Sequence, residues 1–155
     1  MRLVLFCLAL LSTPALAEEH HHLAEAGGLR VLHAWTAATT GREADVFLRI
    51  ENRGDEEAML TGASVAEAGR VEIVGFGFQD GAEVWTRLPS LPIPAKITME
   101  LEPHNLALRL KDIGEPLEAG RHLDMVLEFG ATRLPVEVEV GPLGATSHSH
   151  AGHDH

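Results

Sequence analysis

The sequence predicts an all-β fold, either an antiparallel sandwich or a Greek-key barrel. Between residues 29 and 141, short segments alternate apolar with polar side chains, which is typical of strands with one buried face. Turn-forming glycine, proline, aspartate and asparagine residues separate these segments at fairly regular spacing, as in sandwiches and barrels. No stretch of this region has the 3.6-residue period of an amphipathic helix. A chain of 155 residues is long enough for one hydrophobic core without disulfide or metal crosslinks.

The first half of this region contains three predicted strands. The segment DVFLRIEN alternates and ends at NRGDEE, whose asparagine, glycine and aspartate favour a turn. RVEIVGFGF and EVWTRL follow, joined by QDGAE, a second glycine-containing turn. From the alternation we expect the core of this half to contain Val46, Leu48, Ile50, Val71 and Ile73, together with Met59 and Trp35.

The second half contains four further predicted strands. KITMELE and NLALRL each alternate, and HLDMVLEF and LPVEVEV flank the short turn GAT as a hairpin. In NLALRL, the residues Asn105, Ala107 and Arg109 are expected to point outward. The residues expected to face the core are Ile97, Met99, Leu101, Leu106, Leu108, Leu110, Leu123, Met125, Leu127, Phe129, Val136, Val138 and Val140.

Both ends of the chain differ from this region. Residues 1–17, MRLVLFCLALLSTPALA, have a basic start, a short apolar run and small residues before Glu18, which predicts a cleaved secretory signal peptide. Residues 18–28, EEHHHLAEAGG, are charged and end in a glycine pair, so we expect a mobile lead-in. Residues 142–155, PLGATSHSHAGHDH, contain a single large apolar residue, which predicts a disordered tail.

Composition excludes several classes of function. The formal net charge of −11 repels phosphate backbones, so we expect no nucleic acid partner. The only cysteine, Cys7, lies in the signal peptide, which leaves the mature chain without disulfides, thiolate metal sites or a cysteine nucleophile. No small residues precede Cys7 as a lipid anchor requires, so we expect a periplasmic protein without a membrane anchor. No catalytic triad, paired acid site or phosphate loop occurs, which predicts that the protein is not an enzyme.

Three segments match a known pattern in their order and spacing. They are HAWTAATTGREADVFLRIENRGDEEAMLTGASVAEAGRVEI, LPIPAKITMELEP and LKDIGEPLEAG. Over about residues 30–140, the chain thereby resembles the periplasmic copper chaperones known as PCu(A)C, also written PCuAC. The resemblance implies a cupredoxin-like β-barrel that carries Cu(I) to cytochrome oxidase or another copper protein. It also implies periplasmic partners that donate or receive copper.

The family's copper ligands are not present at the corresponding positions. In that family, a histidine, a methionine and a later His-x-Met pair hold the metal, and these soft neutral ligands suit Cu(I). By the resemblance, the four positions fall on Val74, Trp85, Ala107 and Arg109. None of these side chains is a copper ligand, and arginine places a fixed positive charge where a cation would bind. We therefore expect the family's copper site to be absent, with Trp85 covering the vacated patch.

Histidines cluster at the two ends of the chain instead. The tail contains His148, His150, His153 and His155, which can bring several neutral imidazoles to one ion, and Asp154 can add an oxygen. Nitrogen ligands favour Cu(II) over Cu(I), although zinc and nickel also suit such a segment. The alternative is a solubilising extension that binds metals only weakly.

The other histidines are weaker candidates. Adjacent residues of an extended chain point in alternate directions, so at most two of His20, His21 and His22 face one ion. If the lead-in and the tail leave the same end of the barrel, the two clusters close on one metal. His33, His104 and His122 lie in the strand region, where surface or hydrogen-bonded roles are usual. A rebuilt metal site from His33 and His104 is the minority interpretation.

The sequence leaves three functions open. The first is a periplasmic copper chaperone, carrier or buffer whose metal is bound mainly by the histidine-rich ends. The second is a protein-interaction module that has lost metal transfer and uses the surface around Trp85 and Arg109. The third is a zinc or nickel buffer. In the metal-binding cases, ions bridging two tails allow a dimer without a barrel interface.

Overall fold

The computed structural model describes residues 23–147, and every regular element in that range is a β-strand. The strands are β1 (Leu23–Ala26), β2 (Leu29–Ala37), β3 (Glu43–Asn52), β4 (Ala58–Leu60), β5 (Gly62–Val65), β6 (Ala68–Gln79), β7 (Ala82–Leu88), β8 (Leu91–Ile93), β9 (Thr98–Leu101), β10 (Leu106–Ile113), β11 (His122–Phe129) and β12 (Thr132–Gly141). The predicted all-β class is confirmed. In this range there is also no helix that could cross a membrane.

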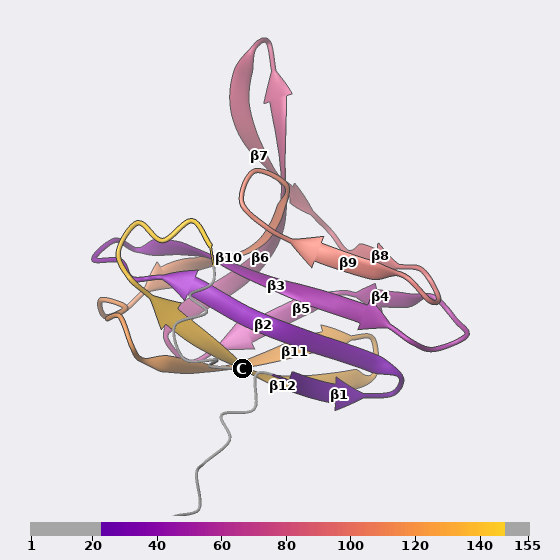
Figure 1. Cartoon of the computed structure of the whole chain (residues 1–155). Coiled ribbons are helices and arrows are strands. Elements are labelled where there is room, and N and C mark those ends of the chain that lie inside the picture. The colour runs from indigo at the N-terminus through magenta and orange to yellow at the C-terminus, as the bar shows by residue number, and fades with distance from the viewer. Residues whose placement is uncertain (1–22, 148–155) are drawn as a thin grey trace, which may run out of the picture.

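One curled sheet forms most of the molecule (Figure 1). Its strand order is β5-β11-β12-β2-β3-β10-β6-β7, with β1 also paired to β2 and β9 to β3, while β4 and β8 form a separate two-stranded sheet. Only residues 66–67 separate β5, at one end of this order, from β6 near the other end. A strand path whose ends are joined so tightly curls round on itself, which gives the barrel-like shape.

All described strand pairs are antiparallel except one. β12 runs parallel to β2, with Glu139 opposite Trp35 and Gly141 opposite Ala37. The sequence predicted an antiparallel sheet throughout. The parallel pair was missed because alternation identifies strands but carries no information on their direction. The parallel pair places the last strand beside the first long one.

The main core lies on the inner face of the curled sheet, and alternation predicted most of it correctly. Two predicted core residues are wrong. Ile97 is 46% exposed because it lies in a turn before β9, where its N–H donates to the Pro94 carbonyl at 3.2 Å. Met59 is 36% exposed because its neighbour Leu60 takes the inward position of the short strand β4. The fully buried residues include Val46, Ile50, Leu108, Leu110, Leu123, Leu127 and Val138.

A β-bulge in β2 determines which face Trp35 occupies. Leu32 lies opposite Arg49 and Trp35 lies opposite Phe47, so β2 contains one residue more than β3 between these pairs. The extra residue moves Trp35 to the outer face of the sheet, although simple alternation would put it on the inner one. Within the bulge, His33 has a φ of 52°, in the left-handed region. Trp35 is therefore buried, as predicted, but outside the main core.

Ordered structure extends past both predicted boundaries of the strand region. Residues 23–26, assigned from the sequence to the mobile lead-in, form β1 and pair with β2. Gly27 and Gly28 both have positive φ and form the tight turn between these two strands. At the other end, residues 142–147 were assigned to the disordered tail, yet Ala145 packs on the outer face of the sheet.

Candidate functional site

The outer face of the sheet carries a second apolar cluster, which we call the outer cluster. Its buried members are Trp35, Phe47, Val74 and Ala107, and Trp85 and Ala145 pack against them. The rings of Trp35 and Phe47 lie 5.0 Å apart between centroids. Ala107 was predicted to point outward, and it does so, but it is fully buried because the outer cluster covers it.

The four positions expected to correspond to the family's copper ligands meet in this outer cluster. Val74 lies directly opposite Ala107 in the ladder between β6 and β10. Trp85 reaches the cluster from β7, and the guanidinium carbon of Arg109 lies 4.8 Å from the centre of the Trp85 ring. The fold thus brings together residues that are far apart in the chain. Their aliphatic, indole and guanidinium groups provide no thioether or imidazole for a copper ion.

Arg109 is fixed in place by Asp45 from the neighbouring strand β3. Its Nε donates to Asp45 Oδ1 at 2.7 Å and its Nη2 donates to Oδ2 at 2.8 Å, which makes a bidentate ion pair. The two side chains are only 17% and 24% exposed. The hydrogen bond to Asp45 raises the pKa of Arg109 above its ordinary value, so the guanidinium stays charged against the Trp85 ring. Asp45 was not among the predicted site residues, because the sequence shows it only as one acidic residue on the outward face of DVFLRIEN.

Next to the outer cluster, the hairpin of β6 and β7 stands out from the body of the molecule (Figure 1). Phe76 makes edge-to-face contacts with Phe78, Trp85 and His104, with centroid separations of 5.5, 5.2 and 5.3 Å. Phe78 is 69% exposed. The hairpin therefore presents aromatic surface to solvent, and His104 packs against this aromatic group.

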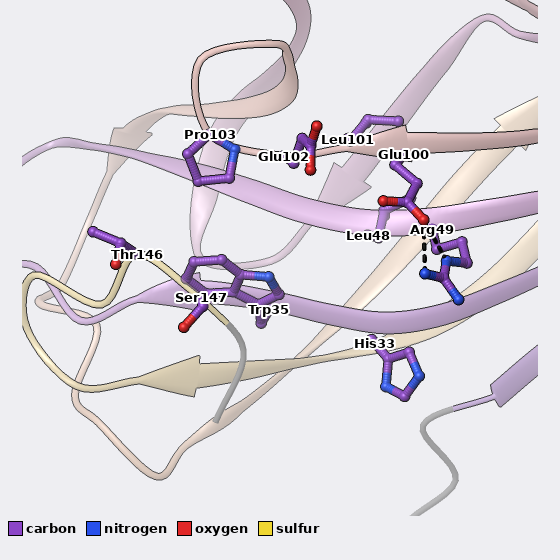
Figure 2. A pocket seen from close by; sticks show the side chains of 10 residues that line it. All are labelled: His33, Trp35, Leu48, Arg49, Glu100, Leu101, Glu102, Pro103, Thr146 and Ser147. Carbon is purple, nitrogen blue, oxygen red and sulfur yellow. Dashed lines mark hydrogen bonds and ion pairs between the residues drawn. The ribbon is translucent and has the colours of Figure 1, made fainter. Parts of the chain in front are cut away.

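His33 lies at a pocket of about 220 Å³ (Figure 2). Two carboxylates line it, and one of them, Glu100, is paired with Arg49 through a 2.7 Å contact between Nη2 and Oε1. In Figure 2, Trp35 lies between His33 and Ser147, the last described residue. The full lining consists of His33, Trp35, Leu48, Arg49, Glu100, Leu101, Glu102, Pro103, Thr146 and Ser147.

The structure does not assemble the predicted histidines into a complete site. Within residues 23–147, no group of three or more histidine, cysteine, aspartate or glutamate side chains is placed to hold a metal ion. His33 lines the pocket, His104 contacts Phe76, and His122 Nε2 lies 3.9 Å from Glu137 Oε1 on the neighbouring strand. The predicted ligands that lie outside the described residues are His20, His21, His22, His148, His150, His153 and His155.

Comparison with known sequences gives one family and one relative. The model of a family described as "Putative lipoprotein LpqE-like" matches residues 29–140, which run from β2 to β12. The protein named "Putative lipoprotein Lxx21020", from Leifsonia xyli subsp. xyli (strain CTCB07), is 29% identical over 130 residues. That match covers 83% of this chain and 78% of the relative.

Solved structures of PCuAC domains have the same fold. The apo PCuAC domain from PmoF1 is 26% identical with a TM-score of 0.67, and the match covers 78% of this chain and 99% of that one. The copper-bound PCuAC domain from PmoF2 is 19% identical with a TM-score of 0.66, and the match covers 78% of this chain and 98% of that one. The fold that the resemblance implied is confirmed.

Proposed function

Because this chain belongs to the LpqE-like family and has the fold of PCuAC domains, we propose that it binds copper outside the cytoplasm and carries or buffers it. The PmoF2 domain with this fold is copper-bound, which supports copper as the cargo. A periplasmic location after removal of residues 1–17 belongs to the same proposal. The protein would act without catalysis, by exchanging the ion with a copper-donating or copper-receiving protein, for example during cytochrome oxidase assembly.

The outer cluster supports placing the copper away from the four family positions. Val74, Ala107 and Trp85 fill that region with apolar groups, and Asp45 already pairs with the remaining residue, Arg109. Copper would instead be held mainly by imidazoles of the chain ends. The proposed ligands are His148, His150, His153 and His155, with His20, His21 and His22 contributing. Such a nitrogen-rich set favours Cu(II).

The test is a Cu(II) titration of the chain from Glu18 to His155 and of a version that ends at Ser147. Ending at Ser147 removes only the histidine-rich residues and keeps Ala145 on the outer cluster. We expect the shorter chain to lose copper equivalents and to bind the remainder more weakly. Identical stoichiometry and affinity of the two chains would contradict the proposal.

Metal identity needs a separate measurement. We expect copper to be the main metal bound to protein that is isolated, at its native abundance, from its own cells. Inductively coupled plasma mass spectrometry measures the metal content. Zinc or nickel in its place would make the protein a buffer for that ion, since histidine-rich segments also bind both metals.

A second function is favoured by the aromatic hairpin. Phe78 and the neighbouring Phe76 and Trp85 form an aromatic surface of the kind enriched in protein interfaces. In this alternative the protein is an interaction module that has lost metal transfer. Replacement Trp85→Ala would then abolish capture of the partner while copper uptake stays normal. Unchanged capture by the variant argues against this function.

A further inference from the structure

The projecting hairpin of β6 and β7 ends the main sheet with an open edge. β7 is the last strand in the order of the sheet, and β6 is the one described strand that pairs with it. Figure 1 shows the hairpin standing clear of the body of the molecule. The free side of an edge strand presents unpaired N–H and C=O groups, which can pair with a strand of another chain.

The turn of the hairpin determines which backbone groups face this edge. Asp80 and Gly81 have φ angles of 53° and 81°, as in a two-residue type I′ turn. Such a turn makes Gln79 and Ala82, on either side of it, a hydrogen-bonded pair. Hydrogen-bonded and non-hydrogen-bonded pairs then alternate along the two strands. Every second residue of β7 therefore directs its backbone groups away from β6.

The residues with outward backbone groups are Glu83, Trp85 and Arg87. Each belongs to a non-hydrogen-bonded pair of the hairpin by this alternation. The backbone of β6 agrees, because the N–H of Phe76, which lies opposite Trp85, donates to the Asn105 carbonyl at 2.7 Å and not to β7. The open edge thus offers three evenly spaced sets of donors and acceptors.

We propose that β7 pairs antiparallel with β7 of a second copy of this chain, around a twofold axis at Trp85. Trp85 is the central residue of the strand Ala82–Leu88, so this register pairs the strand along its whole length. Glu83 would exchange backbone hydrogen bonds with Arg87 of the second copy, and Trp85 with its own counterpart. The proposal does not rest on the copper function, because no metal takes part in the contact.

The charges of β7 complement each other in this register. Glu83 and Arg87 are both exposed, and neither has an ion-pair partner within residues 23–147. They lie about 13 Å apart along the strand, too far to pair with each other in one chain. The twofold axis at Trp85 puts each of them directly opposite the other residue in the second copy. Registers centred on position 83 or 87 would instead place like charges opposite each other, which is destabilising.

The side chains on the outer face also suit a second copy. Phe76 and Trp85 already lie in edge-to-face contact at 5.2 Å, and Phe78 next to them is 69% exposed. Across the new strand pair, Trp85 would meet Trp85 of the second copy, so that one row of aromatic rings continues from hairpin to hairpin. Pro89 follows β7 directly and has no N–H to donate, so it ends the ladder at the strand boundary.

The first test is sedimentation velocity on the chain from Glu18 to His155, with EDTA present to exclude metal bridges between chain ends. One strand pair makes a small interface, so we expect the chain to pass from monomer to dimer between about 10 and 500 µM. A chain that remains monomeric up to about 1 mM would overturn the proposal and leave the edge to a different protein.

Reversal of the two charges tests the register. Glu83→Arg would place arginines opposite each other at both ends of the strand pair, and Arg87→Glu would place glutamates there. Each change alone should weaken association at least about tenfold, because like charges repel. An equimolar mixture of the two variants should associate nearly as tightly as the parent chain, because every glutamate again faces an arginine. Failure of the mixture to associate would overturn the proposal.

Matched controls separate the β7 edge from the overall charge of the chain. Glu118→Arg lies in the loop between β10 and β11, and Arg133→Glu lies on β12. They change the net charge by the same amounts at exposed positions away from the hairpin. Each should alter association less than about twofold. Equal weakening by the controls and the β7 variants would show that net charge governs association, and would overturn the proposal.

A second measurement locates the contact without substitutions. Amide hydrogen exchange of Glu83, Trp85 and Arg87 should be fast in the monomer and slower at concentrations where the dimer predominates. The amides of Val84 and Thr86 are the internal controls, because they point toward β6 and should be protected at both concentrations. Unchanged exchange of the three outward amides in a sample that sedimentation shows to be dimeric would place the contact elsewhere and would overturn the proposal.

Discussion

The main core and the outer cluster lie on opposite faces of the same strands, yet they are buried by different means. In β3, Val46 and Leu48 point into the core while Phe47 between them points into the outer cluster. The core is buried because the sheet curls round on itself. The buried residues of the outer cluster are covered because the side chains of Trp85 and Ala145 pack against them. Alternation along a strand without a bulge, such as β3, therefore identifies the inner face, whereas burial of the outer face depends on distant parts of the chain.

The largest expected effect comes from the main core. Leu108→Ala should lower the free energy of unfolding by about 2–5 kcal/mol, because the side chain is fully buried and leaves a cavity. Urea denaturation followed by circular dichroism measures the change. Ile97→Ala is the control, since Ile97 was predicted as core but is exposed, and it should cost less than about 0.5 kcal/mol. Equal losses in both variants would contradict the observed core.

The next effect concerns the ion pair beside the outer cluster. Asp45→Ala should lower the free energy of unfolding by about 1–3 kcal/mol, because it leaves the half-buried Arg109 guanidinium without its carboxylate. The matched control is Glu100→Ala, which removes the acid of the more exposed pair with Arg49 and should cost at most about 1 kcal/mol. A larger loss for Glu100→Ala would mean that the Asp45 pair does not stabilise the outer face as described.

A smaller effect should come from the segment after β12. Ending the chain at Gly141 instead of Ser147 removes Ala145 from the outer cluster and should cost about 1 kcal/mol, roughly the burial of one methyl group. The fluorescence of Trp35 should shift to longer wavelength as water reaches it. Trp85→Phe makes Trp35 the only tryptophan for this measurement. Identical emission from both lengths of chain would show that the segment does not cover the cluster.

The smallest expected effect is a pH dependence at the exposed end of the β3–β10 ladder. Lys111 Nζ donates to Glu43 Oε1 at 2.6 Å, and this hydrogen bond lowers the pKa of Glu43 below its ordinary value of 4.5. Because the folded pKa lies below the unfolded one, the pair contributes stability above about pH 4.5, which is lost as the pH falls through the folded pKa. Lys111→Met should raise the Glu43 pKa in an NMR titration, whereas Lys96→Met should leave it unchanged. An unaltered Glu43 pKa in the Lys111 variant would exclude the hydrogen bond from Lys111 as the cause of the lowered pKa.

Much of the fold was predictable because it is local. Period-two alternation located β3, β6, β7 and the hairpin of β11 and β12, and turn residues separated them. Two features were missed because they depend on pairing with distant strands: the parallel direction of β12 against β2, and the bulge that turns Trp35 to the outer face. Strand β1 was missed for a different reason, since its four residues are too few to show a clear alternation, although the hairpin it forms with β2 is local.

Less of the candidate site could be predicted. The resemblance placed Val74, Trp85, Ala107 and Arg109 together, and the structure does bring them together in the outer cluster. Asp45 was missed because a lone acidic residue at the start of a strand looks like ordinary surface. The nearness of Leu23 and Ser147 to His33 could not be derived either, because it depends on which strands flank β2.

The parallel pairing of β12 with β2 also bears on how the chain folds. β1 completes the first half of one edge of β2 almost at once, whereas positions 35–37 on that edge pair only with the final strand. A chain that emerges with its N-terminus first therefore leaves this edge open until residues 139–141 have emerged. Contacts between such distant residues form slowly. Docking of β12 against β2 is accordingly a late step of folding, and the pocket at Trp35 forms only after this docking.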